Sequence, residues 1–147
     1  REYHYVFNDH KYPGVPELNI IPIGNNPFLL DGVIPVQPIE VMHYKMPVLG
    51  FRFGDFAYIT DAKTVANEEI EKLQNLEVLI VNALRKEEHI SHFNLEEALA
   101  FIAKVNPKKA YLTHISHLFG THAEIMSELP ENIEVAYDGL TFEFDTP

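Results

Sequence analysis

Residues 77–113, EVLIVNALRKEEHISHFNLEEALAFIAKVNPKKAYLT, contain a strand pattern, a helix pattern and a second strand pattern in succession. Residues 77–82 are almost entirely apolar, which is typical of a strand buried on both faces. Asn94 is a good helix N-cap, a glutamate follows it three residues later, and an apolar stripe then runs over residues 95–105. Residues 109–113 form the second strand pattern. This βαβ-like alternation predicts an α/β architecture.

Strand patterns also precede this unit. Residues 33–41 and 48–53 are rich in Val, Ile and Phe, and residues 55–60 follow the second run through the tight turn Gly54-Asp55. These runs predict hairpins, and a short helix is expected over residues 67–74 because its apolar positions share one face. Hairpins combined with βαβ alternation predict a mixed sheet.

The C-terminal part has a third helix pattern, over residues 123–129, which stops at Pro130. Residues 135–137 and 140–144 are expected to pair as a terminal hairpin, since Asp138-Gly139 between them is a hairpin turn signal.

The N-terminal residues 1–32 are rich in aromatic residues and turn formers and predict a loop-rich segment. Short apolar runs at residues 19–23 and 28–30 are expected as edge strands, because prolines interrupt them. Residues 33–147 are expected to form the main folded portion.

The composition excludes several classes of protein. Eleven Lys and Arg stand against 22 Asp and Glu, so the formal net charge is −11, and an acidic chain repels nucleic acid. No apolar run approaches the ~20 residues that span a bilayer, so no membrane partner is expected. The chain has no cysteine, which excludes disulfides and thiolate metal sites and is compatible with the reducing cytoplasm, the compartment that we expect.

Four His and Asp residues lie at or near the ends of the predicted strands: His43, Asp61, His92 and His114. In open α/β sheets, ligands bind outside the carboxyl ends of the strands. Imidazole and carboxylate are the usual ligands of catalytic zinc and manganese. Each residue also has an ordinary structural interpretation, because a single His after a strand is more often a surface residue and Asp61 could form an Asx turn.

Five stretches together resemble the metallo-β-lactamase superfamily: residues 58–62 (YITDA), 89–99 (HISHFNLEEAL), 112–117 (LTHISH), 129–130 (LP) and 136–140 (AYDGL). The likeness is greatest to its phosphodiesterase branch, which contains phosphoribosyl 1,2-cyclic phosphate phosphodiesterase and the tRNA 3′-processing nucleases. The separation of His92 and His114, 114 − 92 = 22 residues, agrees with that branch. The resemblance implies an α/β fold in which this chain is mainly the second half of a four-layer αββα sandwich.

The resemblance also implies roles for these residues. His43 resembles a ligand of the first of two divalent metal ions, Asp61 the carboxylate that bridges them, and His114 a ligand of the second. His92 resembles a histidine that is not a ligand and donates a proton to the leaving oxygen of a phosphate ester. The two ions, zinc or manganese, would lower the pKa of a shared hydroxide that attacks the phosphorus.

Other histidines and one aspartate receive weaker assignments. His117 is expected to contact substrate or a metal ligand, with a purely structural role equally open. Asp138 is expected to orient His114 or His117, or to be only the turn residue before Gly139. His89 is interpreted mainly as an ordinary loop residue.

One element of the superfamily pattern is missing. The motif His-x-His-x-Asp-His, which supplies most of the metal ligands in the family, does not occur in this sequence. We therefore expect the chain to be the C-terminal portion of a longer protein, which by itself is inactive or at best a weak binder of a single metal ion. It would expose an apolar surface that makes it a candidate for a homodimer or for strand exchange.

The predicted function is that of a metal-dependent hydrolase, specifically a phosphodiesterase for a small or cyclic phosphate ester. Two alternatives stay open at this point. One is hydrolysis of a lactone, thioester or β-lactam on the same fold, and the other is a non-catalytic scaffold that has lost the metal motif.

Overall fold

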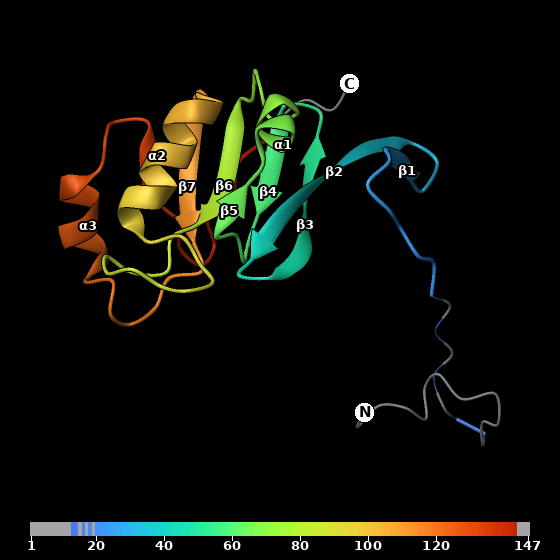
Figure 1. Ribbon diagram of the computed structural model, residues 1–147, viewed down its shortest axis with the longest axis horizontal. Helices are drawn as coiled ribbons and strands as arrows, with labels where there is room; N and C mark the ends of the chain where they lie inside the picture. The colour runs from blue at the N-terminus through green and yellow to red at the C-terminus, as the bar shows by residue number, and fades with distance from the viewer. Residues whose placement is uncertain (1–12, 15, 17, 19, 144–147) are drawn as a thin grey trace.

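The computed structural model describes residues 13, 14, 16, 18 and 20–143 (Figure 1). In chain order the elements are β1 (Phe28–Leu30), β2 (Ile34–His43), β3 (Met46–Phe53), β4 (Phe56–Ile59), β5 (Thr64–Val65), α1 (Asn67–Glu71), β6 (Val78–Asn82), α2 (Leu95–Val105), β7 (Lys109–Thr113), α3 (His122–Glu128) and β8 (Ile133–Val135).

All of the strands join one eight-stranded sheet in the order β1-β2-β3-β4-β6-β7-β8, with β5 paired to β2. The pairs from β1 to β4 are antiparallel, as is β2 with β5. The pairs β4–β6, β6–β7 and β7–β8 are parallel. The chain is therefore an α/β protein with a mixed sheet, which confirms the predicted fold class.

The core lies between one face of the sheet and the helices. Alternate residues of β4, β6 and β7 are fully buried, among them Ile59, Leu79 and Leu112. Helix α2 packs over this face and is joined there by α1 (Figure 1). Its buried side chains complete one hydrophobic cluster with the strands: Ala98, Phe101, Ile102 and Val105.

The helix α2 begins and ends where the sequence predicts. The Asn94 side chain accepts a hydrogen bond from the Glu97 N–H, and the Glu97 side chain accepts from the Asn94 N–H, which completes a capping box. Asn106 ends the helix in the left-handed conformation, with φ of 53°. The capping box at Asn94 fixes the point at which the loop after β6 enters the helix.

The opposite face of the sheet is aromatic. Phe53 packs on Phe56 with ring centroids 6.1 Å apart, and Phe142 stacks on Tyr111 at 5.6 Å. Tyr58 on the same face is 42% exposed. We refer to these five residues as the aromatic face.

Two predicted elements are absent. The terminal hairpin is wrong over its described part, because β8 pairs in parallel with β7 and residues 140–143 form no strand. Residue 144 lies outside the described residues. The edge strand at residues 28–30 is confirmed as β1, but the one expected at 19–23 is not present at residues 20–23. The first twelve residues of the predicted loop-rich segment lie outside the description.

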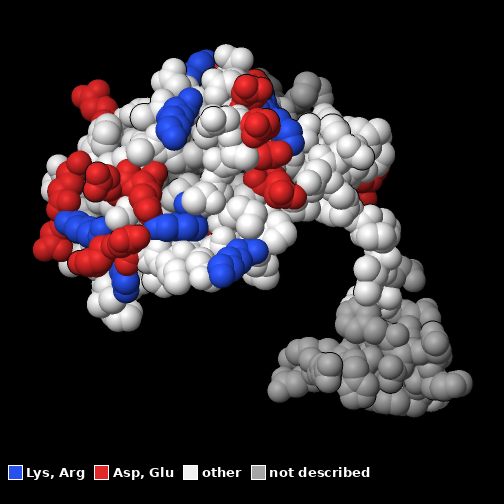
Figure 2. Space-filling view, in the orientation of Figure 1, with Lys and Arg blue, Asp and Glu red and all other residues white. Residues whose placement is uncertain are grey.

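The charged side chains are unevenly spread on the visible face (Figure 2). Acidic side chains gather on the side of α2 and α3 and over α1, with single Lys and Arg residues between them. None of the helices in the described part of the chain is long and apolar enough to cross a membrane.

Candidate metal centre

The four residues predicted at strand ends come together at one edge of the sheet. Donor atoms of His43, Asp61 and His92 all lie within 4.8 Å of one another. His114 joins them, with its Nε2 3.6 Å from Oδ1 of Asp61. Side chains separated by up to 71 positions (114 − 43) therefore form one cluster.

The sheet topology explains this meeting. Strands β4, β6 and β7 are adjacent and parallel, so their carboxyl ends share one edge. β2 runs in the same direction as β4, because each is antiparallel to the intervening β3. His43 ends β2, Asp61 follows β4, His92 lies in the loop after β6, and His114 follows β7. The cluster thus occupies the usual ligand-binding edge of an α/β sheet.

A buried amide fixes the backbone beside Asp61. Asn82, at the end of β6, is fully buried, and its Oδ1 accepts from the Ala62 N–H at 2.8 Å. Its Nδ2 donates to the Ala62 carbonyl at 3.0 Å, where the Phe93 N–H also donates at 2.8 Å. The loops that carry Asp61 and His92 are therefore joined through the backbone of Ala62.

Asp61 does not form the Asx turn that was its alternative interpretation. The Lys63 N–H, which such a turn would use, donates instead to the Met42 carbonyl at 2.8 Å. Asp61 has φ of 57° and His114 has φ of 58°, conformations that are uncommon for residues other than glycine. Backbone strain of this kind concentrates at functional sites.

The environment of Asp61 favours its charged form. Burial raises the pKa of the carboxyl, but the hydrogen bond with His92 and the charge of His114 lower it, and the pKa ends below its ordinary value. A carboxylate that stays ionised is a suitable ligand for a divalent cation.

His92 is the most enclosed member of the cluster. Its side chain is 11% exposed, against 44% for Asp61, and its Nε2 lies 3.0 Å from Oδ1 of Asp61. Its ring stacks on His114 and meets His43 edge-on, with centroid distances of 4.7 Å in both cases. Burial lowers the pKa of the His92 imidazole below its ordinary value, and the hydrogen bond with Asp61 offsets only part of that effect.

Two residues that contact the His92 ring were not predicted as site residues from the sequence. Ser91 Oγ and His89 Nδ1 lie 3.0 and 3.2 Å from Nδ1 of His92. His89 was interpreted as an ordinary loop residue, because one sequence gives no sign that residues 89 and 92 turn toward each other. The spacing His-x-Ser-His, with three polar side chains in four positions, was the available signal.

The two weaker candidates stand apart from this cluster. Among the described residues, no hydrogen bond or ion pair joins His117 or Asp138 to His43, Asp61, His92 or His114. Both His117 and Asp138 are exposed. Their roles as substrate contact and orienting group stay predictions.

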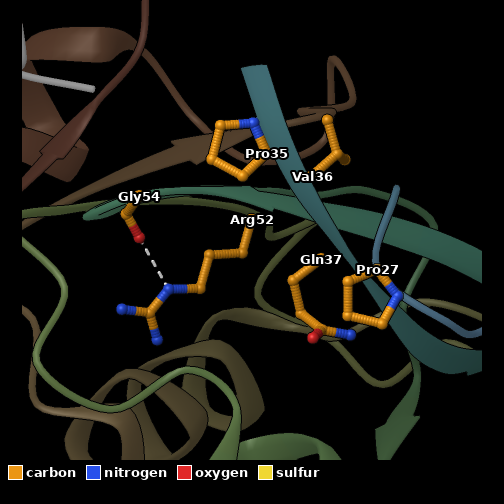
Figure 3. Close-up of a pocket in the computed structure, with 6 residues that line it drawn as sticks. All are labelled: Pro27, Pro35, Val36, Gln37, Arg52 and Gly54. Carbon is orange, nitrogen blue, oxygen red and sulfur yellow. Dashed lines mark hydrogen bonds between the residues drawn. The ribbon is translucent and has the colours of Figure 1, made fainter. Parts of the chain in front are cut away.

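A hollow of about 290 Å³ lies elsewhere, between the segment before β1 and the strands β2 and β3 (Figure 3). Its charged side chain, Arg52, already donates to the carbonyls of Gly54 and Lys72, both at 2.6 Å. Gln37 at the hollow is six residues before His43 on the same strand, roughly 20 Å along it at ~3.3 Å per residue. The hollow is therefore separate from the histidine cluster.

The donor set fits a divalent transition metal. It consists of imidazole nitrogens and a carboxylate, the ligands that zinc and manganese share. His92 supplies one of the three donor atoms that lie within 4.8 Å of one another. Its proximity to His43 and Asp61 is therefore compatible both with a metal ligand and with a proton donor. The separate roles of the four residues stay predictions.

The family model described as the beta-lactamase superfamily domain matches residues 1–115. The chain belongs to the metallo-β-lactamase superfamily. This confirms the family that the sequence motifs indicated.

Relatives of this superfamily chain differ in their named activities. A diphosphatase of the PhnP family has a solved structure that is 32% identical, with a TM-score of 0.85 over 88% of this chain and 51% of its own. A curated relative from Porphyromonas gingivalis, named octanoyltransferase, is 37% identical over 138 residues, which are 93% of this chain and 28% of the relative. Zinc-bound PqqB from Methylobacterium extorquens shares the fold at 17% identity, with a TM-score of 0.67 over 82% of this chain and 54% of its own. The chain thus spans about half the length of the diphosphatase and less of the curated relative.

Proposed function

We propose that this superfamily hydrolase is a phosphodiesterase that acts on a small or cyclic phosphate ester. The observation that carries the proposal is the cluster of His43, Asp61, His92 and His114, in a chain that is 32% identical to a diphosphatase of the PhnP family. Superfamily membership alone supports the broader statement that the protein is a metal-dependent hydrolase.

In this proposal three residues of the cluster are metal ligands and the fourth is a proton donor. His43, Asp61 and His114 would hold two divalent metal ions, zinc or manganese, and Asp61 would be a ligand of both. When bound, such ions supply positive charge against the phosphoryl oxygens and activate water at neutral pH. His92, in its charged form with both ring nitrogens protonated, gives the Nε2 proton to the departing alkoxide, which is a poor leaving group without an acid, and the ring is left neutral with its proton on Nδ1.

Three side chains are too few for two catalytic metal sites, since a catalytic zinc commonly has three protein ligands of its own. We propose that the remaining ligands come from sequence outside this chain. The support is that the chain covers 51% of the similar diphosphatase.

The name of the curated relative favours a different chemistry, namely acyl transfer. The match covers only 28% of that relative, so its name does not assign acyl transfer to the matched part. Hydrolysis of an acyl substrate, such as a thioester or lactone, is nevertheless the second candidate because of this name. A scaffold domain that binds no metal is the third.

The proposal also includes the partners. We propose a small-molecule phosphate ester rather than nucleic acid or a membrane, because the chain carries a net charge of −11. We propose the cytoplasm as its compartment. The homodimer expected from the sequence stays a prediction, and the aromatic face supports it as an apolar surface that a second copy could cover. Sedimentation at two concentrations of the chain and of a Tyr58→Glu variant tests the dimer.

The test of function compares substrates on the longest natural protein that contains this chain. With zinc or manganese added, we expect hydrolysis of bis-p-nitrophenyl phosphate and none of a lactone or of nitrocefin. Turnover of the lactone alone would favour the second candidate. No metal in the purified protein and no turnover of any substrate would favour the scaffold.

A further inference from the structure

Three polar atoms form a closed triangle behind His92. Nδ1 of His92 lies 3.0 Å from Ser91 Oγ and 3.2 Å from Nδ1 of His89, and those two atoms are 3.3 Å apart. Ser91 is 7% exposed and His92 is 9% exposed. The Ser91 and His92 atoms of the triangle are therefore largely shielded from water and need hydrogen-bond partners within the protein, whereas His89 is half-buried.

The opposite side of the His92 ring determines where its proton lies. An ionised carboxylate is only an acceptor, and Oδ1 of Asp61 lies 3.0 Å from Nε2. Nε2 must therefore carry the hydrogen, and in the neutral ring Nδ1 is left as an acceptor.

The neighbours of Nδ1 match this requirement. The Ser91 hydroxyl can donate to Nδ1, and two unprotonated ring nitrogens cannot face each other at 3.2 Å, so His89 carries its proton on Nδ1. The Ser91 N–H also points at His89 Nδ1, but at 3.4 Å this contact is longer than the one between the rings. In the charged form the second proton of His92 is on Nδ1, where the Ser91 hydroxyl can accept it, and His89 can also accept it at Nδ1 when its own proton is on Nε2.

We propose that Ser91 and His89 are positioning residues, which hold the His92 ring through Nδ1 so that its proton stays on Nε2 and faces Asp61. The arrangement has a consequence for the role of His92. A histidine that ligates metal through Nε2 has no proton there, whereas a proton donor needs one. The triangle favours the donor role, and this catalytic consequence rests on the proposed function.

The first experiment reads the tautomer directly and needs neither metal nor activity. Long-range ¹H–¹⁵N NMR on the histidine-labelled chain without metal distinguishes protonated from unprotonated ring nitrogens. We expect His92 with Nε2 protonated and Nδ1 bare at a pH where the ring is neutral. A proton on Nδ1 with Nε2 bare would overturn the proposal, whatever the enzyme hydrolyses.

Variants of the two positioning residues extend this test. Ser91→Ala and His89→Leu should each give a mixture of His92 tautomers, whereas His89→Asn, whose amide places a donor near the lost Nδ1–H, should restore the single form. Ser127→Ala and His122→Leu on α3 are matched controls and should leave the His92 signals unchanged. Melting curves check that each variant is folded, and tautomers unaffected in both folded Ser91→Ala and His89→Leu would contradict the proposal.

The second experiment measures the effect on proton donation in the longest natural protein. Ser91→Ala should lower kcat about 10- to 100-fold, the usual effect of losing a hydrogen-bond partner behind a functional imidazole, for a diester with an alkyl leaving group. It should change kcat little for p-nitrophenol, which departs without an acid, and KM should be unchanged for both. An equal loss on both substrates would refute the positioning role. Absence of turnover in the unmodified protein, together with the expected tautomer, would refute only the proposed function.

Discussion

Oδ1 of Asp61 lies 3.0 Å from Nε2 of His92, and the same oxygen is 3.6 Å from Nε2 of His114. The same carboxylate oxygen therefore lies close to two imidazoles, which belong to the loops after β6 and β7. Because the two rings also stack on each other, a change at Asp61 affects both histidines.

The first prediction concerns metal binding at Asp61. Asp61→Ala removes the carboxylate proposed as a ligand of both metal ions. The affinity of the variant chain for Zn²⁺ or Mn²⁺ should therefore fall by more than ~10- to 100-fold, which is the loss typical of removing a group that only hydrogen-bonds to a ligand. Calorimetric titration of the chain with each metal alone measures the effect. Asp55→Ala is the matched control, since Asp55 is a surface aspartate 3.8 Å from Arg52 and should bind metal like the parent. Equal affinities in the parent and in Asp61→Ala would remove Asp61 from the metal centre.

The second prediction separates His92 from the ligands. His92→Ala should retain bound metal in the longest natural protein but lose about 10²- to 10⁴-fold in turnover of an alkyl phosphodiester, the range typical of a lost general acid. Metal content and kcat on the same preparation are the measurements. Full activity would contradict the role of His92 as acid, and loss of metal would instead identify it as a ligand.

The elements of the fold that the sequence predicts well are those with a local signal. Helix α2 has a capping box and a continuous apolar stripe, and its observed bounds equal the predicted ones. The terminal hairpin had only the turn signal of Asp138-Gly139. In the structure β8 pairs with the neighbouring parallel strand, and Phe142 stacks on Tyr111 instead of entering a ladder. The turn itself forms, with the Leu140 N–H donating to the Tyr137 carbonyl at 3.1 Å, but tertiary packing, which no local pattern encodes, determines how the strands pair.

In the site, too, some features have a signal in the sequence and others do not. His43, Asp61, His92 and His114 could be predicted to converge, because strand ends are visible in the sequence and parallel strands end at a common edge. The positions of Ser91, His89 and Asn82 depend on the path of a loop and on one buried amide. These contacts require coordinates, since nothing in the spacing of residues 82 and 62 indicates that they meet.

The third prediction concerns that buried amide. Asn82→Ala removes both hydrogen bonds to Ala62 and leaves a buried N–H without a partner, which should destabilise the protein by about 1–3 kcal/mol. Urea unfolding measures the change. Asn132→Ala, at an exposed position, should lie within about 0.5 kcal/mol of the parent. Because Ala62 adjoins Asp61, the folded Asn82→Ala protein should also bind metal more weakly, and unchanged stability would show that water or a shifted backbone replaces the amide.

The fourth prediction concerns the close approach of β3 and β4. Gly50 is buried, and a Cβ there would lie 2.9 Å from Cγ1 of Ile59 and 3.0 Å from the Tyr58 carbonyl oxygen. Backbone cannot give way as a flexible side-chain end can, so Gly50→Ala should destabilise the chain by about 1–3 kcal/mol, as overpacked cores do. Ile59 is two residues before Asp61, so the strain should reach the metal centre and lower metal affinity even in the folded fraction. Gly24→Ala is the control, because a Cβ at Gly24 meets nothing within 4 Å and φ there is not positive. Thermal melting and metal titration of both variants test this, and a Gly50→Ala protein as stable as Gly24→Ala would show that the two strands can separate without loss.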